Sequence, residues 1–117
     1  MSLDVYLRDS VDDECKCCWQ QTQDLYWANI THNLNTMADK AWIYEALWHP
    51  SEIWAVKAKD IIPLLEKGLK KLKDNPTKYK KYNSKNWWGT YEHFIPFVED
   101  YLEACKWDSE AYIIVST

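Results

Sequence analysis

Two short stretches concentrate the side chains that could bind a ligand or transfer a proton. The first is ANITHNLNTM, residues 28–37, which places amides, hydroxyls and an imidazole directly before a helical pattern. A helix that begins here would present backbone N–H groups and the positive end of its dipole, to which Thr31, His32 and Asn33 add side-chain donors. The stretch predicts a cradle for an anionic or polar ligand, with Asn29 at the end of the preceding strand. The alternative is an elaborate helix cap, in which these side chains bond only neighbouring backbone.

The second stretch is NSKNWWGTYEHF, residues 83–94, which again combines a loop with the start of a helix. It offers Trp88 and Tyr91 for stacking, and Glu92 and His93 for hydrogen bonding or proton transfer. Aromatic walls and helix-end donors together suit a nucleotide, with the base stacked on an indole and the phosphate at a helix N-terminus. The alternative is that the tryptophans plug the core beneath a loop and that Glu92 is a favourable first-turn charge. The predicted ligand-binding residues are Asn29, Thr31, His32, Asn33, Trp88, Tyr91, Glu92 and His93.

The sequence gives weaker evidence for catalysis than for ligand binding. His32, Glu92 and His93 could form an acid/base set, but nothing in the sequence places them together. The chain has no P-loop, no G-x-G-x-x-G, no G-x-S-x-G and no H-E-x-x-H. We therefore favour binding over enzymatic activity, and predict no catalytic residue and no cofactor.

Cysteine spacing gives a weak metal signal. Cys15 and Cys18 have C-x-x-C spacing, which could supply half of a zinc site. A second C-x-x-C pair is missing, so no metal is predicted. Cys105 falls on the core face of a predicted helix, where a free thiol packs as a small apolar group.

Composition narrows the class of protein. A chain of 117 residues predicts a single domain over 1–117. The net charge of -4 gives no general attraction to nucleic acid, and no apolar run approaches the ~20 residues that span a bilayer. The N-terminus lacks the layout of a signal peptide, so we expect a cytoplasmic protein without membrane contacts. Eight Trp and eight Tyr exceed what a core of this size can hide, so some should face a ligand or another chain.

Periodicity predicts the elements that must position these residues. Alternating or branched-aromatic patterns predict strands over 3–8, 25–30 and 111–116. A short helix capped by Asn33 or its neighbours follows the second strand, and longer helices cover 60–74, with Asp60 as N-cap, and 91–107, with Thr90 as N-cap. The acidic segment 9–24 is expected to be a surface loop. The predicted fold is a small two-layer α+β domain with three strands against two or three helices, and its open sheet edges predict a homo-oligomer by edge pairing.

Glycine is unusually scarce, with only Gly68 and Gly89 in the whole chain. Trp42 follows a predicted helix end where a left-handed glycine would be natural, and Trp87 follows Asn86 where a turn favours glycine.

Along three of its motifs the chain resembles a family of small proteins encoded by bacteriophages and prophages. The motifs are NITHNLNTMADKA, KAKDIIPLLEKGLKKLKDNPTKYKKYN and NWWGTYEHFIPFVEDYLEACK, and the resemblance covers residues 25 to 117. The family has no assigned activity, so the resemblance implies a phage origin but no biochemical activity. Its pattern has glycine where this chain has Trp42, Trp54 and Trp87, which suggests that the source genome reads a codon unusually.

By analogy, small phage accessory proteins without catalytic motifs act by binding. We therefore expect a protein that sequesters a small anionic, nucleotide-like ligand, such as an immune signal in counter-defence. One alternative is a protein-binding inhibitor or structural interaction module acting on a host protein, with Trp48, Trp54 and the acidic loop as contacts. The other is a small nucleotide hydrolase that uses His32 and Glu92.

Overall fold

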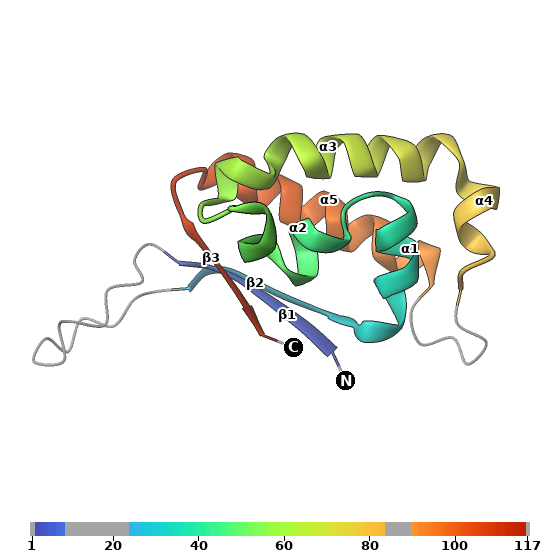
Figure 1. Ribbon diagram of the computed structural model, residues 1–117, viewed down its shortest axis with the longest axis horizontal. Coiled ribbons are helices and arrows are strands. Elements are labelled where there is room, and N and C mark those ends of the chain that lie inside the picture. Colours follow the sequence, from blue (N-terminus) through green and yellow to red (C-terminus); the bar gives the residue numbers. More distant parts are fainter. Residues whose placement is uncertain (1, 9–23, 84–89, 117) are drawn as a thin grey trace, which may run out of the picture.

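The chain folds into two layers, a three-stranded sheet and a set of helices that covers one face of it (Figure 1). The computed structural model describes residues 2–8, 24–83 and 90–116. The strands are β1 (Ser2–Arg8), β2 (Asp24–Thr31) and β3 (Tyr112–Ser116), and they pair antiparallel in the order β2–β1–β3. The predicted α+β fold and its three strands are therefore confirmed.

The helical layer is built from two long helices and several short ones. The α-helices are α1 (Asn35–Lys40), α2 (Tyr44–Trp48), α3 (Ala58–Asp74), α4 (Pro76–Lys80) and α5 (Tyr91–Trp107). Two 3-10 turns, η1 (His32–Leu34) and η2 (Pro50–Ile53), precede α1 and follow α2. The two long helices match the predicted ones, whereas the region between 31 and 57 is divided into more short helical pieces than periodicity indicated. None of the described helices is both long and apolar enough to cross a membrane.

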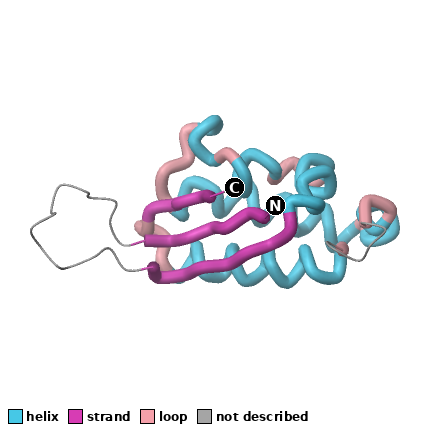
Figure 2. Tube along the Cα trace, turned by 90° about the horizontal axis from the view of Figure 1, so that it is seen from below, coloured by secondary structure: helices cyan, strands magenta, loops and turns pink. Residues whose placement is uncertain are grey.

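The strand alternation divides the sheet into a buried and an uncovered face. The inward side chains of β1 are fully buried under the helices: Leu3, Val5 and Leu7. The inner side of α5 meets them with Phe94, Val98 and Tyr101, which are also fully buried. Figure 2, which views the molecule of Figure 1 from below, shows the outer face of the sheet in front of the helices, with no described helix over it. The core is therefore a single apolar layer between the sheet and the helices.

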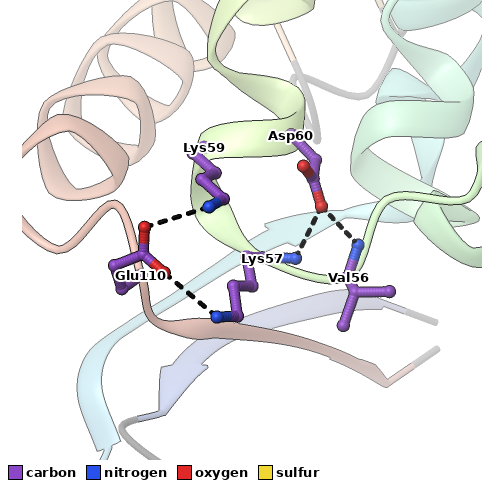
Figure 3. A network of polar contacts seen from close by, with 5 residues as sticks. All are labelled: Val56, Lys57, Lys59, Asp60 and Glu110. Atoms are coloured by element: carbon purple, nitrogen blue, oxygen red, sulfur yellow. Dashed lines mark hydrogen bonds and ion pairs between the residues drawn. The ribbon is translucent and has the colours of Figure 1, made fainter.

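The start of α3 differs from the prediction. The helix begins at Ala58, and Asp60 stands in its first turn instead of preceding it. One Asp60 carboxylate oxygen accepts hydrogen bonds from the backbone N–H groups of Val56 and Lys57, both at 3.0 Å (Figure 3). These two bonds hold the pKa of Asp60 below its usual range. The prediction of Asp60 as N-cap was wrong by three positions, because its carboxylate reaches back to the entering backbone.

A carboxylate from the opposite end of the chain secures the same helix start. Glu110 bonds the ammonium groups of Lys57 and Lys59, each at 3.0 Å (Figure 3). The backbone N–H of Ala58 donates to the Ala111 carbonyl at 2.8 Å. Since β3 begins directly after these residues, the contacts fix where the last strand enters the sheet.

Two tryptophans occupy left-handed backbone positions at helix ends. Trp42 follows α1 with a φ of 68°, and Trp54 follows η2 with a φ of 62°. After α1, the N–H of Trp42 donates to Asp39 and the N–H of Ile43 donates to Ala38, at 3.1 and 2.9 Å. This pair of bonds is the Schellman motif, whose left-handed residue is most often glycine. The expectation that Trp42 stands where glycine would be natural is therefore confirmed in its backbone geometry.

Candidate functional site

A cavity lies between β2 and α5, along the edge of β2 that pairs with no described strand. Its volume is about 430 Å³. The lining residues are Tyr26, Ala28, Asn29, Ile30, Thr31, Leu34, His93, Phe97 and Asp100. Three of the predicted ligand-binding residues, Asn29, Thr31 and His93, therefore meet at one cavity although more than 60 positions of sequence separate Thr31 from His93.

Thr31 pairs with Ser2 at the end of β2, on the same outward side of the strand alternation as Asn29, and it is both a cap and part of the cavity wall. Its Oγ1 accepts a hydrogen bond from the backbone N–H of Asn33 at 3.4 Å, which closes the turn into η1. A hydroxyl that accepts such a bond still carries one hydrogen that it can donate. The prediction that Asn33 or its neighbours cap this helical segment is met by Thr31 at η1, whereas α1 itself starts after Leu34 without a side-chain cap bond.

Asn29 contributes less than its residue type suggested. Strand alternation puts its side chain on the outer face of the sheet, where Nδ2 donates to Asp4 Oδ1 at 2.6 Å. Because the amide is already engaged there, Asn29 borders the cavity as part of the strand edge and not as a dedicated side-chain ligand.

His93 stands one turn into α5 on the helix face that borders the cavity. Its Nδ1 lies 3.1 Å from Oγ1 of Thr90, the residue that precedes the helix as predicted. When the Thr90 hydroxyl donates to Nδ1, the other ring nitrogen carries the proton and becomes a donor. The spacing of His93, Phe97 and Asp100 is that of one helical face, so all three reach the same side of α5.

The deeper wall is aromatic. Tyr26 stacks on the fully buried Tyr101, with ring centroids 5.9 Å apart and planes 8° from parallel. Burial, assisted by the Asp100 carboxylate, raises the pKa of Tyr26 to about 12, so its phenol stays neutral at physiological pH. Phe97 forms the facing apolar surface. The cavity therefore offers flat apolar walls with a few polar groups at its rim, an arrangement that suits a planar polar molecule.

The charge of the lining is acidic. Asp100 is the one carboxylate among the described lining residues, and no lysine or arginine is among them. The helix start that was expected to attract an anion is a three-residue 3-10 turn followed by a six-residue helix, so its dipole is small. Electrostatics in the described part of the cavity therefore favour a neutral group over an anion.

Tyr91 and Glu92 do not line the cavity. Tyr91 donates its hydroxyl hydrogen to the Leu72 carbonyl at 2.7 Å, which links α5 to α3. Glu92 is exposed and lies 3.6 Å from the Lys80 ammonium. Its own backbone N–H is the main group that holds its pKa below the usual range, whereas a general base works best with a pKa near neutrality. Both residues tie helices together.

The remaining predicted residues contribute little to this picture. Asn33 is exposed and is not among the lining residues. Trp88 and the side chain of His32 lie outside the described part of the chain, as do Cys15 and Cys18. Cys105 is buried on the core face of α5, as predicted, and burial raises the pKa of its thiol to about 12, which makes it a poor nucleophile.

Sequence reasoning missed Tyr26, Phe97 and Asp100 as site residues. Tyr26 and Phe97 were assigned to a strand and to a core face, because an aromatic at an inward position gives no sign that a cavity adjoins it. Asp100 could have been predicted as a site residue, since it lies seven residues after His93, two turns along the same helical face.

The fold and the cavity define a small two-layer α+β domain with a lateral pocket at the edge of its sheet. No family model matches the chain, and no curated protein or solved structure was found to be similar to it.

Proposed function

We propose that this protein binds a small nucleotide-like ligand in the cavity between β2 and α5. The observation that carries the proposal is the convergence of Thr31 and His93 on one cavity with aromatic walls. A volume of about 430 Å³ falls in the range of small-molecule sites. The resemblance to phage-encoded proteins is the ground for the biological role, which is to sequester an immune signal in the cytoplasm of an infected bacterium.

The described walls account for the base of such a ligand better than for its phosphate. Tyr26 and Phe97 offer surfaces for a planar ring, and Thr31 and His93 offer hydrogen bonds to its edge. Asp100 opposes a phosphate, and we expect it to limit the affinity for any anionic ligand. Comparison of nucleosides with the matching nucleotides therefore tests the anionic part of the proposal separately from the binding itself.

The first experiment is thermal unfolding against a panel of nucleosides and mono-, di- and cyclic nucleotides. A ligand at 100 times its Kd adds ~2.7 kcal/mol to the stability of the folded state, a shift of several degrees for a domain of this size. Thr31→Val should weaken binding roughly tenfold, by the loss of about one hydrogen bond. Thr36→Val makes the same chemical change on the exposed face of α1, outside this cavity, and should leave the affinity unchanged.

Asp100→Asn removes the negative charge of the cavity lining while it keeps the size of the side chain, so it tests the effect of that charge on ligand affinity. At an effective separation of ~4 Å in a water-like dielectric, removal of one carboxylate is worth ~1 kcal/mol to a phosphate, or about fivefold in Kd. A nucleoside should show no such gain, and Glu103→Gln on the exposed side of the same helix is the control. If no compound stabilises the protein, the nucleotide proposal fails and the polar stretch 28–37 is a helix cap.

The hydrolase alternative requires His32 and Glu92 to share a substrate. Glu92 pairs with Lys80 outside the lining of the described cavity, which gives that mechanism no geometric support. In the host-protein alternative, Trp48 cannot be an exposed anchor because it is buried, whereas Trp54 is 90% exposed. The exposed tryptophan is the observation that favours this second candidate, and capture of a host protein that depends on Trp54 would support it.

A further inference from the structure

The cavity between β2 and α5 has two chemically different ends. The strand and the helix run in opposite directions, so the start of β2 lies beside the second half of α5 (Figure 1). Tyr26 stacks there on Tyr101, and the Asp100 carboxylate is close enough to add to the effect of burial in raising the pKa of Tyr26. Thr31 comes five residues later on β2 and His93 seven residues earlier on α5, so both stand at the opposite end of the cavity.

The end at Asp100 accepts hydrogen bonds. A carboxylate has two acceptor oxygens and no donor. Among the residues that the structure describes, none donates a hydrogen bond to Asp100 or forms an ion pair with it. Its two oxygens can therefore take a pair of adjacent N–H groups from a ligand, and such two-pronged bonds add geometric specificity to binding energy.

The end at His93 donates hydrogen bonds. Its Nδ1 lies 3.1 Å from Oγ1 of Thr90, which leaves Nε2–H as a donor when that hydroxyl donates to Nδ1. Oγ1 of Thr31 accepts from the backbone N–H of Asn33 and keeps its own hydrogen for another partner. This end of the cavity is therefore complementary to acceptor atoms.

We propose that this cavity selects guanine among the nucleobases, which rests on the proposed function of binding a nucleotide-like ligand. In guanine N7 and O6 are neighbouring acceptors, and N1–H and N2–H₂ are adjacent donors further round the ring. His93 and Asp100 are separated by about 10.5 Å along the axis of α5, with Phe97 between them. A purine with a hydrogen bond at each end has a comparable length. With its ring against Phe97, guanine gives its two donors to Asp100 and turns N7 towards His93.

The other bases match only one end of the cavity at a time. Adenine has a single donor group, N6–H₂, beside the acceptor N1, so one Asp100 oxygen would face a lone pair. When adenine places N7 at His93, its N6 amine also stands where guanine has the acceptor O6. Pyrimidines have one ring and are too short to bond both ends. Guanine is therefore the base whose pattern fits Asp100 and His93 together.

Calorimetric titration with nucleosides tests each end separately, without the phosphate that Asp100 opposes. Inosine lacks only the N2 amine of guanosine, so it should bind roughly tenfold more weakly, the worth of one bond to a charged group at an exposed rim. The analogue 7-deazaguanosine lacks only N7 and should bind about fivefold more weakly, the worth of one neutral hydrogen bond. Adenosine should be weaker than either analogue.

Asp100→Asn is the decisive variant. Its amide has one acceptor and one donor group, so N1–H can still be bound while N2–H₂ meets another N–H. The preference for guanosine over inosine should therefore fall to within about twofold. The preference over 7-deazaguanosine arises at His93 and should persist. Glu103→Gln, on the exposed side of the same helix, should leave both preferences unchanged, and the unfolding temperature without ligand shows that each variant keeps the fold.

Two kinds of failure give different results. If no nucleoside and no nucleotide binds, the proposed function fails and the selection of guanine fails with it. If nucleosides bind but guanosine is not preferred over inosine and adenosine, the selection of guanine is overturned while ligand binding stands. The same holds if the preference over inosine survives in Asp100→Asn, because Asp100 would then not be the group that recognises the N2 amine.

Discussion

Replacement of Trp54 by glycine should stabilise the protein. Trp54 adopts a φ of 62° and its side chain is 90% exposed, so its Cβ is strained while its indole gains little from burial. A left-handed conformation costs a residue with a Cβ roughly 1–2 kcal/mol. Glycine removes that cost but adds ~0.5–1 kcal/mol of unfolded-state entropy. The expected net gain is about 0.5–1 kcal/mol, a rise of a few degrees in the unfolding temperature.

Chemical denaturation of three variants checks the reasoning. Trp54→Ala removes the same indole but keeps the Cβ, so it should gain nothing from relief of strain. Trp107→Gly also removes a tryptophan that is 86% exposed, but from the last position of α5, where the backbone is not left-handed, so glycine relieves no strain there and should not stabilise. Equal stabilities for Trp54→Gly and Trp54→Ala would refute the argument that the backbone conformation is the cause.

Trp42→Gly should stabilise less than Trp54→Gly. Trp42 has the same left-handed geometry, but the Lys71 ammonium lies 5.1 Å from its ring centroid. An exposed cation–π contact contributes ~0.5–1 kcal/mol, which offsets most of the relief. Both positions bear on the hypothesis of an unusual codon. Mass spectrometry of the protein from its native source decides that question, since tryptophan masses at positions 42 and 54 would end it.

Three further changes probe the core and the start of α3. Gly68→Ala should destabilise by ~1–3 kcal/mol, because the added Cβ would overlap Cγ2 of the buried Ile43, and the penalty should shrink in an Ile43→Ala background. Tyr101→Phe should be neutral or stabilising by up to ~1 kcal/mol, since its buried hydroxyl has no hydrogen-bond partner among the described residues. The lowered pKa of Asp60 means that its contribution is complete above the ordinary Asp value of ~3.9 and is lost as the pH falls through the folded-state value. Urea denaturation between pH 6 and 3 should therefore show a shallower acid loss for Asp60→Asn than for the unaltered chain.

The elements with a clear period were predictable from the sequence. Alternation over 3–8 and the helical spacing of 60–74 and 91–107 each match an observed element within a few residues. The region between Thr31 and Lys57 was harder, because the α1 and α2 helices have only six and five residues. Such short helices show too few turns to establish a period, and their ends are set by tertiary contacts such as those of Ile43.

The cavity was only partly predictable because it is made by contacts distant in sequence. Thr31 and His93 were recognisable by residue type, but their proximity follows from the packing of α5 beside β2. Whether a polar side chain faces a cavity or the opposite side of a sheet depends on register. Asn29 illustrates this, since one step along the strand separates its outward amide from the inward side chains of its neighbours.

The inward residues of β2, Tyr26, Ala28 and Ile30, border the cavity, and the outward residues Asn29 and Thr31 also line it along the edge of β2 that pairs with no described strand. Trp27 has the same outward parity, but it is 57% exposed and is not among the lining residues. Trp27→Ser should therefore leave the shift in unfolding temperature with ligand unchanged, whereas Thr31→Val should reduce it. Loss of the shift in Trp27→Ser would mean that the ligand also contacts the outer face of the sheet, and the binding site would then extend beyond the cavity.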